Sequence, residues 1–316
     1  MLTFLSGIHS RSEGLIDDTR TISESATTQA KLKKSYENDT KKLVHLELKA
    51  NLDLISDGML RWHDPLRLFL QYLDGVIPGP YYRWFETNTF FRKPVVESEL
   101  SLKRKSVFDM FYLDLLPKEQ QKLIILPGPY TLSILSDNFY YRKLEELIFA
   151  YSDVLVHVIR DISSSENINL MLLEPSLVYE TTRPRNELFP LISEAIEKIT
   201  LRVPFSVIHT FFGDVTPVLD LLTNLRRSWI GIDLTETSIA VLTDLKECKI
   251  ALGIIDSSSP IVESPSLLRS YIRIIRKLEL DSVALCPSTD LRYLPRQISD
   301  EKIFALKLLR KAIEAE

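Results

Sequence analysis

Two short apolar runs in the middle of the chain place the strongest constraint on its fold. Phe205–Ile208 is followed by His209, Trp229–Ile232 is followed by Asp233, and a helical pattern that opens at Pro217 lies between them. Short apolar strands that alternate with helices are typical of βαβ units in a parallel sheet. Each run ends where a titratable side chain begins, and sites in parallel barrels are built at that end of the strands. This segment therefore predicts a parallel sheet with a candidate site at its carboxyl edge.

The same alternation extends along the whole chain of 316 residues. An amphipathic helical pattern separates most of the runs, and no Gly-x-Gly-x-x-Gly motif follows the first of them. Both observations favour a closed barrel over a doubly wound sheet. We predict an α/β fold, a TIM (β/α)8 barrel, in a single domain over residues 1–316. The eight candidate strands are Leu2–Ser6, Leu52–Ser56, Lys122–Leu126, Asn169–Leu173, Phe205–Ile208, Trp229–Ile232, Ile250–Ile255 and Ser282–Leu285.

Two segments interrupt the alternation. Thr21–Ala50 has helical periodicity and predicts a long N-terminal helical segment, whose lysines are typical of a solvated face. Residues 60–121 form an insertion after the second strand, with a helix at Pro65–Leu73 and an aromatic run at residues 81–88. We expect this run in a loop, and loops of this kind serve as lids or interfaces. Further helices are expected at Glu187–Leu201, at Leu267–Leu278 with Ser264 as N-cap, and from Ser299 as N-cap onward.

Charge and composition exclude several classes of protein. The net charge is −4 with both signs interspersed, so no basic field indicates a nucleic-acid partner. The two cysteines, Cys248 and Cys286, do not form a disulfide framework and indicate a reducing compartment. No apolar run approaches the roughly 20 residues that a membrane span requires, and no signal peptide is recognisable at the amino terminus. We therefore expect a cytoplasmic protein that does not insert into membranes.

The predicted strand ends carry a ring of polar side chains that would converge at one face of a barrel. Such a ring can bind an amino or pterin nitrogen or hold a metal, and two of its carboxylates could act as a glycosidase pair. The same residue types also cap helices and hydrogen-bond to loop backbone, so a structural role stays open. The residues at the strand ends are Asp57, Glu174, His209, Asp233, Asp256 and Ser288.

A zinc site on this chain is not supported by the spacing of its ligand-type residues. Zinc prefers about four ligands from thiolates, imidazoles and carboxylates. Only Cys286 lies near the same rim as His209, because Cys248 precedes a strand and so falls at the opposite end of the barrel. We therefore expect no metal bound by this chain. The sequence also has no Gly-x-Ser-x-Gly motif and no phosphate-binding loop.

Several segments, in order along nearly the whole chain, resemble the cobalamin-independent methionine synthase family. The resemblance is closest to the amino-terminal barrel of that family, which carries no zinc and contacts the folate tail. It implies a stand-alone, single-barrel member of the family. The matching segments are RWFETN from Arg83, PGPYTL from Pro127, LEPSLV from Leu173, HTFFGDVTPVLD from His209, WIGIDL from Trp229, LGIID from Leu252 and PSTDLRYLP from Pro287.

The resemblance implies roles for individual residues. Arg83 matches a lysine that helps to bind the polyglutamate tail of methyltetrahydrofolate, and arginine adds a fork suited to carboxylates. Arg11 is the nearest counterpart of an early basic motif of the family. The candidate substrate- and pterin-binding residues are therefore Arg11, Arg83, Trp84, Asn88, Glu174, His209, Asp233 and Ser288.

The resemblance also implies where zinc would be bound. The other barrel of the family holds zinc through a histidine, two cysteines and a glutamate, and the matching positions here are His209, Phe211, Asp233 and Thr289. This pattern implies a non-zinc subunit of a split methionine synthase. Its partner subunit would carry the zinc, and together they would transfer methyl from a methyl-tetrahydropterin to homocysteine. The alternatives are a stand-alone methyltransferase of the same family acting on homocysteine, and a non-catalytic pterin-binding module.

Overall fold

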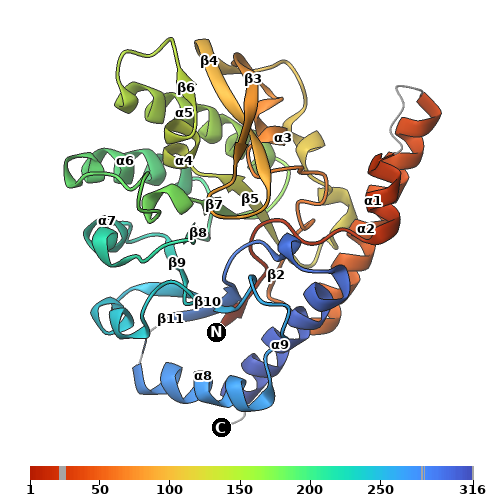
Figure 1. Ribbon diagram of the computed structural model, residues 1–316, viewed down its shortest axis with the longest axis vertical. Helices are drawn as coiled ribbons and strands as arrows, with labels where there is room; N and C mark the ends of the chain where they lie inside the picture. Colours follow the sequence, from red (N-terminus) through yellow and green to blue (C-terminus); the bar gives the residue numbers. More distant parts are fainter. Residues whose placement is uncertain (21–25, 279, 281, 315–316) are drawn as a thin grey trace.

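The computed structural model describes residues 1–20, 26–278, 280 and 282–314, and its main feature is an eight-stranded parallel sheet (Figure 1). Neighbouring strands follow the order β1-β11-β10-β9-β8-β7-β5-β2, and every pairing in this sheet is parallel. The predicted strands are all present. Their bounds are β1 (Leu2–Thr3), β2 (Leu54–Ile55), β5 (Gln121–Pro127), β7 (Ile168–Leu173), β8 (Ser206–Thr210), β9 (Trp229–Asp233), β10 (Lys249–Ile255) and β11 (Ser282–Pro287).

Asp53 closes the sheet between its two end strands, β1 and β2. The backbone N–H of Asp53 donates to the Thr3 carbonyl at 2.9 Å. In return, the Thr3 backbone N–H and hydroxyl donate to Asp53 Oδ2 at 2.8 and 2.9 Å. The same oxygen accepts from Arg310 Nη1 at 2.8 Å, which ties the last helix to the seam. One carboxylate therefore joins the ends of the sheet, and the predicted TIM barrel is confirmed.

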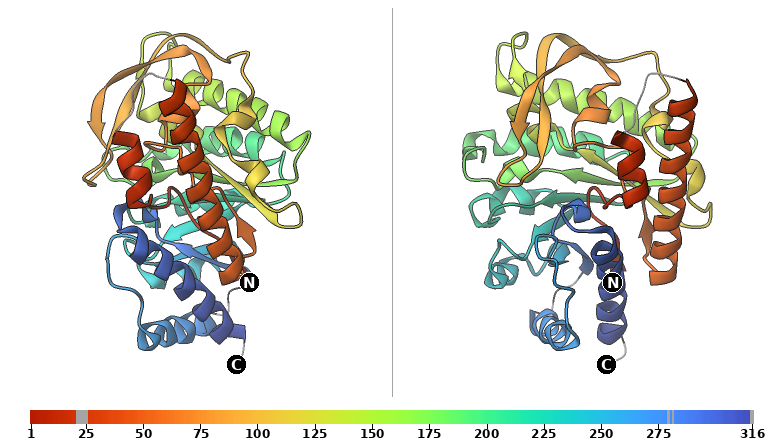
Figure 2. Two further views of the ribbon diagram at one scale, coloured as in Figure 1. Left: turned by 90° about the vertical axis from the view of Figure 1, so that its right-hand side faces the viewer. Right: turned by 45° about the vertical axis from the view of Figure 1, so that its right-hand side comes forward.

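Helices surround the barrel, and α2 and α9 run beside each other along one side of it (Figure 2). The predicted helices at Glu187–Leu201 and Leu267–Leu278 are confirmed, and the Ser264 hydroxyl accepts from Leu267 N–H at 3.3 Å as the expected N-cap. No helix in the described part of the chain combines the length and apolar character that crossing a bilayer requires. The helices are α1 (Glu13–Arg20), α2 (Ala26–Ala50), α3 (Arg67–Leu70), α4 (Pro129–Ile134), α5 (Leu144–Ser163), α6 (Phe189–Thr200), α7 (Leu219–Asn224), α8 (Pro265–Leu278) and α9 (Arg296–Glu314).

One predicted helix start lies outside the described residues, and another differs from the structure. The segment Thr21–Ala50 corresponds to α2 from Ala26 onward, and residues 21–25 lie outside the described residues. Ser299 is not an N-cap, because α9 begins three residues earlier at Arg296. The Ser299 hydroxyl is buried and donates to the Leu291 carbonyl at 3.1 Å, so it fixes the helix to the loop before it.

The insertion after β2 is mainly a β-hairpin: residues 81–83 of the aromatic run belong to a strand, and residues 84–88 lie in the turn, as predicted. Strands β3 (Leu73–Arg83) and β4 (Phe90–Leu102) pair antiparallel, and β6 (Asp137–Asn138) adds to β4. The segment Pro78-Gly79-Pro80 has the composition of a loop, but it lies in β3 at a register shift, where strands tolerate such residues. The helix predicted at Pro65–Leu73 is limited to the four residues of α3.

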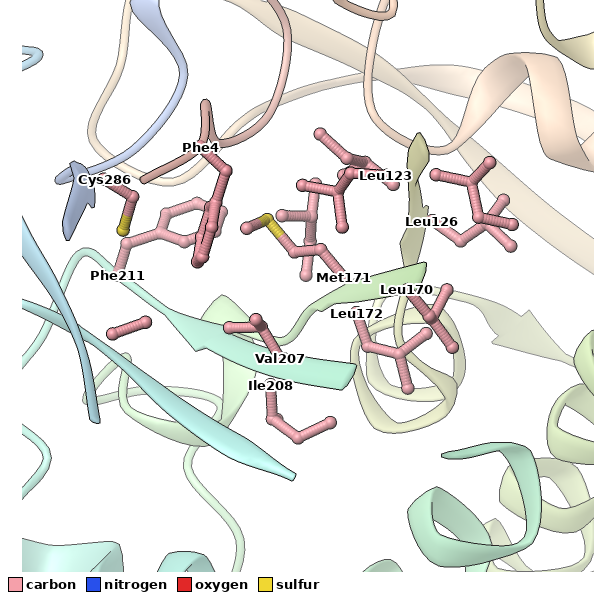
Figure 3. Packing of buried hydrophobic residues seen from close by; sticks show 14 of the residues in the cluster. Phe4, Leu123, Leu126, Leu170, Met171, Leu172, Val207, Ile208, Phe211 and Cys286 are labelled. Carbon is pink, nitrogen blue, oxygen red and sulfur yellow. The ribbon is translucent and has the colours of Figure 1, made fainter. Parts of the chain in front are cut away.

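Alternating side chains of the barrel strands fill its interior. Met171 pairs with Val207, and Leu172 pairs with Ile208, on the adjacent strands β7 and β8. Figure 3 shows Met171 and Val207 on the same side of these strands as Phe211, whereas Leu172 and Ile208 point to the other side. All five side chains are fully buried. One set therefore packs inside the barrel and the other packs under the helices.

Replacing Asp53 with alanine should weaken the closure of the barrel. The change removes two hydrogen bonds from Thr3 and the contact with Arg310, so we expect the free energy of unfolding to fall by about 2–3 kcal/mol. Urea unfolding monitored by circular dichroism measures this loss. Asp17→Ala is the matched control, since Asp17 pairs with Arg20 on an exposed surface, and it should be close to neutral. Equal effects of the two changes would contradict a closing role for Asp53.

Candidate functional site

The carboxyl ends of β7, β8, β9 and β11 bring four of the sequence-predicted residues close together. Glu174 N–H donates to the His209 carbonyl at 2.9 Å, and the His209 ring reaches the Ser288 carbonyl at 3.0 Å. The fourth residue, Asp233, lies near Ser288 with Gly253 between them. A Cβ at Gly253 would stand 2.9 Å from Ser288 Cα and 3.4 Å from Asp233 Cα. The absence of a side chain at Gly253 therefore lets these strand ends approach each other.

Glu174 caps helix α4 from inside the barrel. Its Oε1 accepts from the Tyr130 backbone N–H at 2.9 Å, and its Oε2 accepts from the Thr131 N–H and hydroxyl at 2.8 and 2.6 Å. Gly128 provides the space, because a Cβ there would lie 2.2 Å from the Glu174 carboxyl carbon. Complete burial raises the pKa of Glu174 to about 7 despite these donors. Both carboxyl oxygens are thus engaged by the chain itself.

His209 is completely buried and lies over Gly231. A Cβ at Gly231 would stand 2.4 Å from His209 Nδ1, so glycine is needed beside the ring. Burial lowers the pKa of His209 to about 4, and the imidazole is therefore neutral near pH 7. Because Nε2 faces the Ser288 carbonyl, it carries the proton and donates it there. Nδ1 is left as an acceptor with no hydrogen-bond partner among the described residues.

Three acidic residues at the rim bond mainly to nearby loop backbone. Asp233 Oδ1 accepts from the Thr235 N–H and hydroxyl at 2.9 and 2.6 Å, and burial raises the pKa of Asp233 to about 6. Asp57 accepts from two backbone N–H groups, one of them on Tyr112 in the insertion. Asp256 accepts from the backbone N–H groups of Ser258 and Ser259. These carboxylates therefore shape the loops that form the rim.

The positions that match the family's zinc ligands do not fit zinc. His209 Nε2 is directed at a carbonyl, Phe211 offers only hydrocarbon, and Asp233 Oδ1 is held by Thr235. Burial, and then the nearby Asp233 carboxylate, raise the pKa of the Cys286 thiol well above its ordinary value, so it is not a thiolate. No three histidine, cysteine or acidic side chains within the described ranges are grouped so that they could hold a metal ion.

The tip of the β3–β4 hairpin covers the carboxyl end of the barrel (Figure 1). The Phe85 ring lies 4.8 Å from Tyr179, after β7, and 5.6 Å from Phe212, after β8. Phe212 in turn lies 4.8 Å from Phe211 and 6.4 Å from Tyr293, which follows β11. We call these five rings the aromatic cover. It places an apolar layer above His209, whose ring centroid is 5.4 Å from that of Phe211.

Two members of the aromatic cover have strained backbones. Phe85 has φ = 48° and Phe212 has φ = 68°, in the left-handed region that bulky residues avoid. Such conformations cost about 1–3 kcal/mol each and persist only where the surrounding packing enforces them. Trp84, beside Phe85, is fully buried against the Phe85 and Phe91 rings, and so lies in the core of the hairpin tip.

Polar contacts tie the edge of the hairpin tip to the barrel loops. Tyr179 donates its hydroxyl to Glu86 Oε1 at 2.6 Å. Arg292 donates to the Thr89 hydroxyl at 3.2 Å and pairs with the buried carboxylate of Asp290 at 3.0 Å. The sequence did not single out Arg292, Tyr179 or Phe212 as site residues. The segments from His209 and Pro287 were the available indications, because they contain Phe212 and Arg292.

The basic candidates lie in different surroundings. Arg83 is exposed at the hairpin tip, where it donates to the Thr87 carbonyl at 2.6 Å and to Asn88 Oδ1 at 3.0 Å. The structure thus brings Arg83 and Asn88 together. Arg11 instead donates to the carbonyls of Leu60 and Trp62 at 2.8 and 3.0 Å, so it holds the start of the insertion in place.

Replacing His209 with glutamine keeps an N–H donor and removes a titrating group. Burial lowers the pKa of His209 to about 4 from an ordinary value of 6.5, so between these values the unfolded chain binds the extra proton. The contribution of His209 to folded-state stability therefore falls as the pH falls through this window, by up to about 1.4 kcal/mol per pH unit. We expect H209Q to lower the slope of unfolding free energy against pH by up to this amount between pH 4 and 6.5.

Urea titrations at a series of pH values measure this slope. His45→Gln is the matched control, because it makes the same substitution at an exposed position on α2. If H209Q and H45Q give the same slope as the unmodified protein, His209 does not titrate as described.

Comparisons with known proteins find relatives of this chain among methionine synthases. The sequence profile described as "Cobalamin-independent synthase, N-terminal domain" matches residues 74–261, more than half of the chain. The methionine synthase of Saccharolobus solfataricus is 23% identical over 277 residues, covering 85% of this chain and 81% of that protein. The methionine synthase of Sulfurisphaera tokodaii is 22% identical over 322 residues, covering 99% and 93%.

A solved structure shares the fold. The B12-independent methionine synthase from Shewanella sp. W3-18-1, solved in complex with selenomethionine, has a TM-score of 0.80 at 15% sequence identity. The match covers 99% of both chains, so the barrel and its insertion have counterparts in that protein. Together with the profile match, this confirms the resemblance found in the sequence segments. The chain belongs to the cobalamin-independent methionine synthase family, with its amino-terminal domain as the matching part.

Proposed function

We propose that this chain is the non-zinc subunit of a split methionine synthase of the cytoplasm. It would support methyl transfer from a methyl-tetrahydropterin to homocysteine. Membership of the family supports a role in methionine biosynthesis. The observation that carries the proposal is the donor set at the zinc-ligand positions, where Phe211 and Thr289 stand in place of two thiolates. Thiolates are the soft ligands that hold zinc tightly, so zinc for the reaction is expected on a partner subunit.

In this proposal the hairpin tip binds the donor's tail and meets the partner. Arg83 is exposed and oriented by Thr87 and Asn88, and its remaining N–H groups are free to pair with a tail carboxylate. Trp84 supports the tip from within. Glu174, His209, Asp233 and Ser288 hold the loops of the carboxyl face, which would dock against the zinc-bearing subunit. Arg11 would act indirectly, by fixing the first turn of the insertion.

A second candidate is a stand-alone methyltransferase of the same family acting on homocysteine. One observation favours it: the archaeal relatives named methionine synthase are covered over 81% and 93% of their length. Those chains are therefore close to this one in size. In this case the isolated chain would bind its own metal or use a different donor.

The two candidates differ in what the isolated chain can do. The chain is co-expressed with a zinc-bearing homologue from the same genome, and methyl transfer to homocysteine is assayed for each polypeptide alone and for the mixture. We expect the two to co-purify and the mixture to exceed the zinc-bearing subunit alone. No effect of adding this chain would reject the subunit role. Stoichiometric zinc together with turnover by this chain alone would support the second candidate instead.

Replacing Arg83 with alanine should weaken the binding of a methyl-tetrahydropterin that carries a polyglutamate tail. Loss of one charge-assisted pair corresponds to about a 10-fold rise in Kd. A pterin without the tail should bind equally to both forms, because only the tail meets Arg83. Fluorescence titration of the three tryptophans measures Kd, and Arg104→Ala, an exposed arginine at the far end of β4, is the matched control. A tail-independent loss of affinity would contradict the role of Arg83.

A further inference from the structure

A cavity of about 320 Å³ lies between helix α3 and the β3–β4 hairpin, away from the tip that covers the barrel. Figure 1 shows α3 beside the hairpin strands. Arg83 pairs with Phe90 at the tip, whereas Ile77, in the wall of the cavity, pairs with Val95 farther from the tip. The cavity is therefore separate from the proposed site of Arg83. Its lining combines three cations with apolar side chains: Arg67, Arg92, Lys103, Leu70, Val76 and Ile77.

The three cations keep unused hydrogen-bond donors. Arg92 donates one N–H to the Gly79 carbonyl at 3.0 Å and stacks 4.0 Å above the Tyr81 ring. Lys103 donates to the backbone carbonyl of Gln71, the residue after α3, at 3.2 Å. The guanidinium of Arg67 makes no hydrogen bond or ion pair with any described residue, although the carboxylate of Asp64 lies near enough to interact with it through space. An arginine has five N–H donors and a lysine has three, so most of them remain available.

The positive charges of Arg67, Arg92 and Lys103 are not neutralised by any acidic side chain that lines the cavity. The chain has 43 acidic and 39 basic residues, so partners for surface cations are abundant. Lys93, next to Arg92 in β4, has such a partner, because it pairs with Asp137 of β6. The residues that line the cavity include no aspartate or glutamate. Three positive charges therefore surround one apolar hollow, and a ligand of opposite charge would relieve their repulsion.

We propose that this cavity binds an amphiphilic anion, a carboxylate or phosphate group attached to an apolar body. The anionic group would accept N–H bonds from Arg67, Arg92 and Lys103, as paired arginines and lysines bind carboxylates and phosphates elsewhere. The apolar body would pack against Leu70, Val76 and Ile77. The volume is within the range of small-molecule sites. The proposal does not depend on the role of the chain in methyl transfer.

Isothermal titration calorimetry with four probes tests the ligand class on the full chain. Octanoate and octyl phosphate carry both features, octanol lacks the charge, and inorganic phosphate lacks the apolar body. We expect saturable binding of octanoate, of octyl phosphate or of both, and at least 10-fold weaker binding of octanol and inorganic phosphate. Binding of the charged probes should weaken as the salt concentration rises. The preferred head group identifies the natural anion as a carboxylate or a phosphate.

A matched pair of double variants tests the location. Arg67→Gln with Lys103→Gln removes two cations of the cavity, and Arg104→Gln with Lys105→Gln removes the same two residue types from the neighbouring exposed turn. We expect the first variant to raise Kd at least 10-fold and the second to leave it unchanged, with equal unfolding midpoints for both. Equal losses in the two variants, equal affinity for octanol, or no saturable binding of either charged probe would overturn the proposal.

Discussion

The packing of Phe85 against Phe212 holds together the aromatic cover over the carboxyl ends of β7, β8 and β11. The two rings belong to segments far apart in the sequence, and each sits on a left-handed backbone that only surrounding contacts can maintain. Together with their neighbours they keep water from the strand ends beneath. That exclusion explains the direction of the pKa changes: burial raises those of Glu174 and Asp233 and lowers that of His209.

The polar residues of this face stabilise helix ends and loops through hydrogen bonds, and nearby glycines leave the space that their side chains occupy. Gly128 leaves space for Glu174 to cap α4, and Gly231 leaves space for the His209 ring. In an open barrel such carboxylates would face substrate, whereas here they accept hydrogen bonds from the chain's own backbone. One buried atom keeps its binding capacity, since Nδ1 of His209 has no partner in the described part of the chain. It is an acceptor directly below the aromatic cover.

The sequence predicted the barrel because its strands are buried on both faces and read as uninterrupted apolar runs. The same reasoning located Glu174, His209, Asp233 and Ser288 at one end, since each follows or ends such a run. It failed for the hairpin, where prolines and glycines at bulges imitate a loop. The positive φ angles of Phe85 and Phe212 could not be predicted, because contacts distant in sequence impose them. Arg292 was missed for the same reason: its partners come from three separate loops.

The pairing of β1 with β11 has a consequence for biosynthesis. Leu2 and Thr3 align with Ala284 and Leu285, so β1 cannot complete its pairing until β11, far later in the sequence, has been synthesised. Until then, the hydrogen bonds between Thr3 and Asp53 hold the other edge of β1. Contacts of such long sequence separation form slowly, and an incomplete parallel sheet exposes strand edges with unpaired backbone N–H and C=O groups. The nascent polypeptide therefore remains an open sheet until β11 has been synthesised, and its unpaired strand edges are exposed to aggregation during that interval.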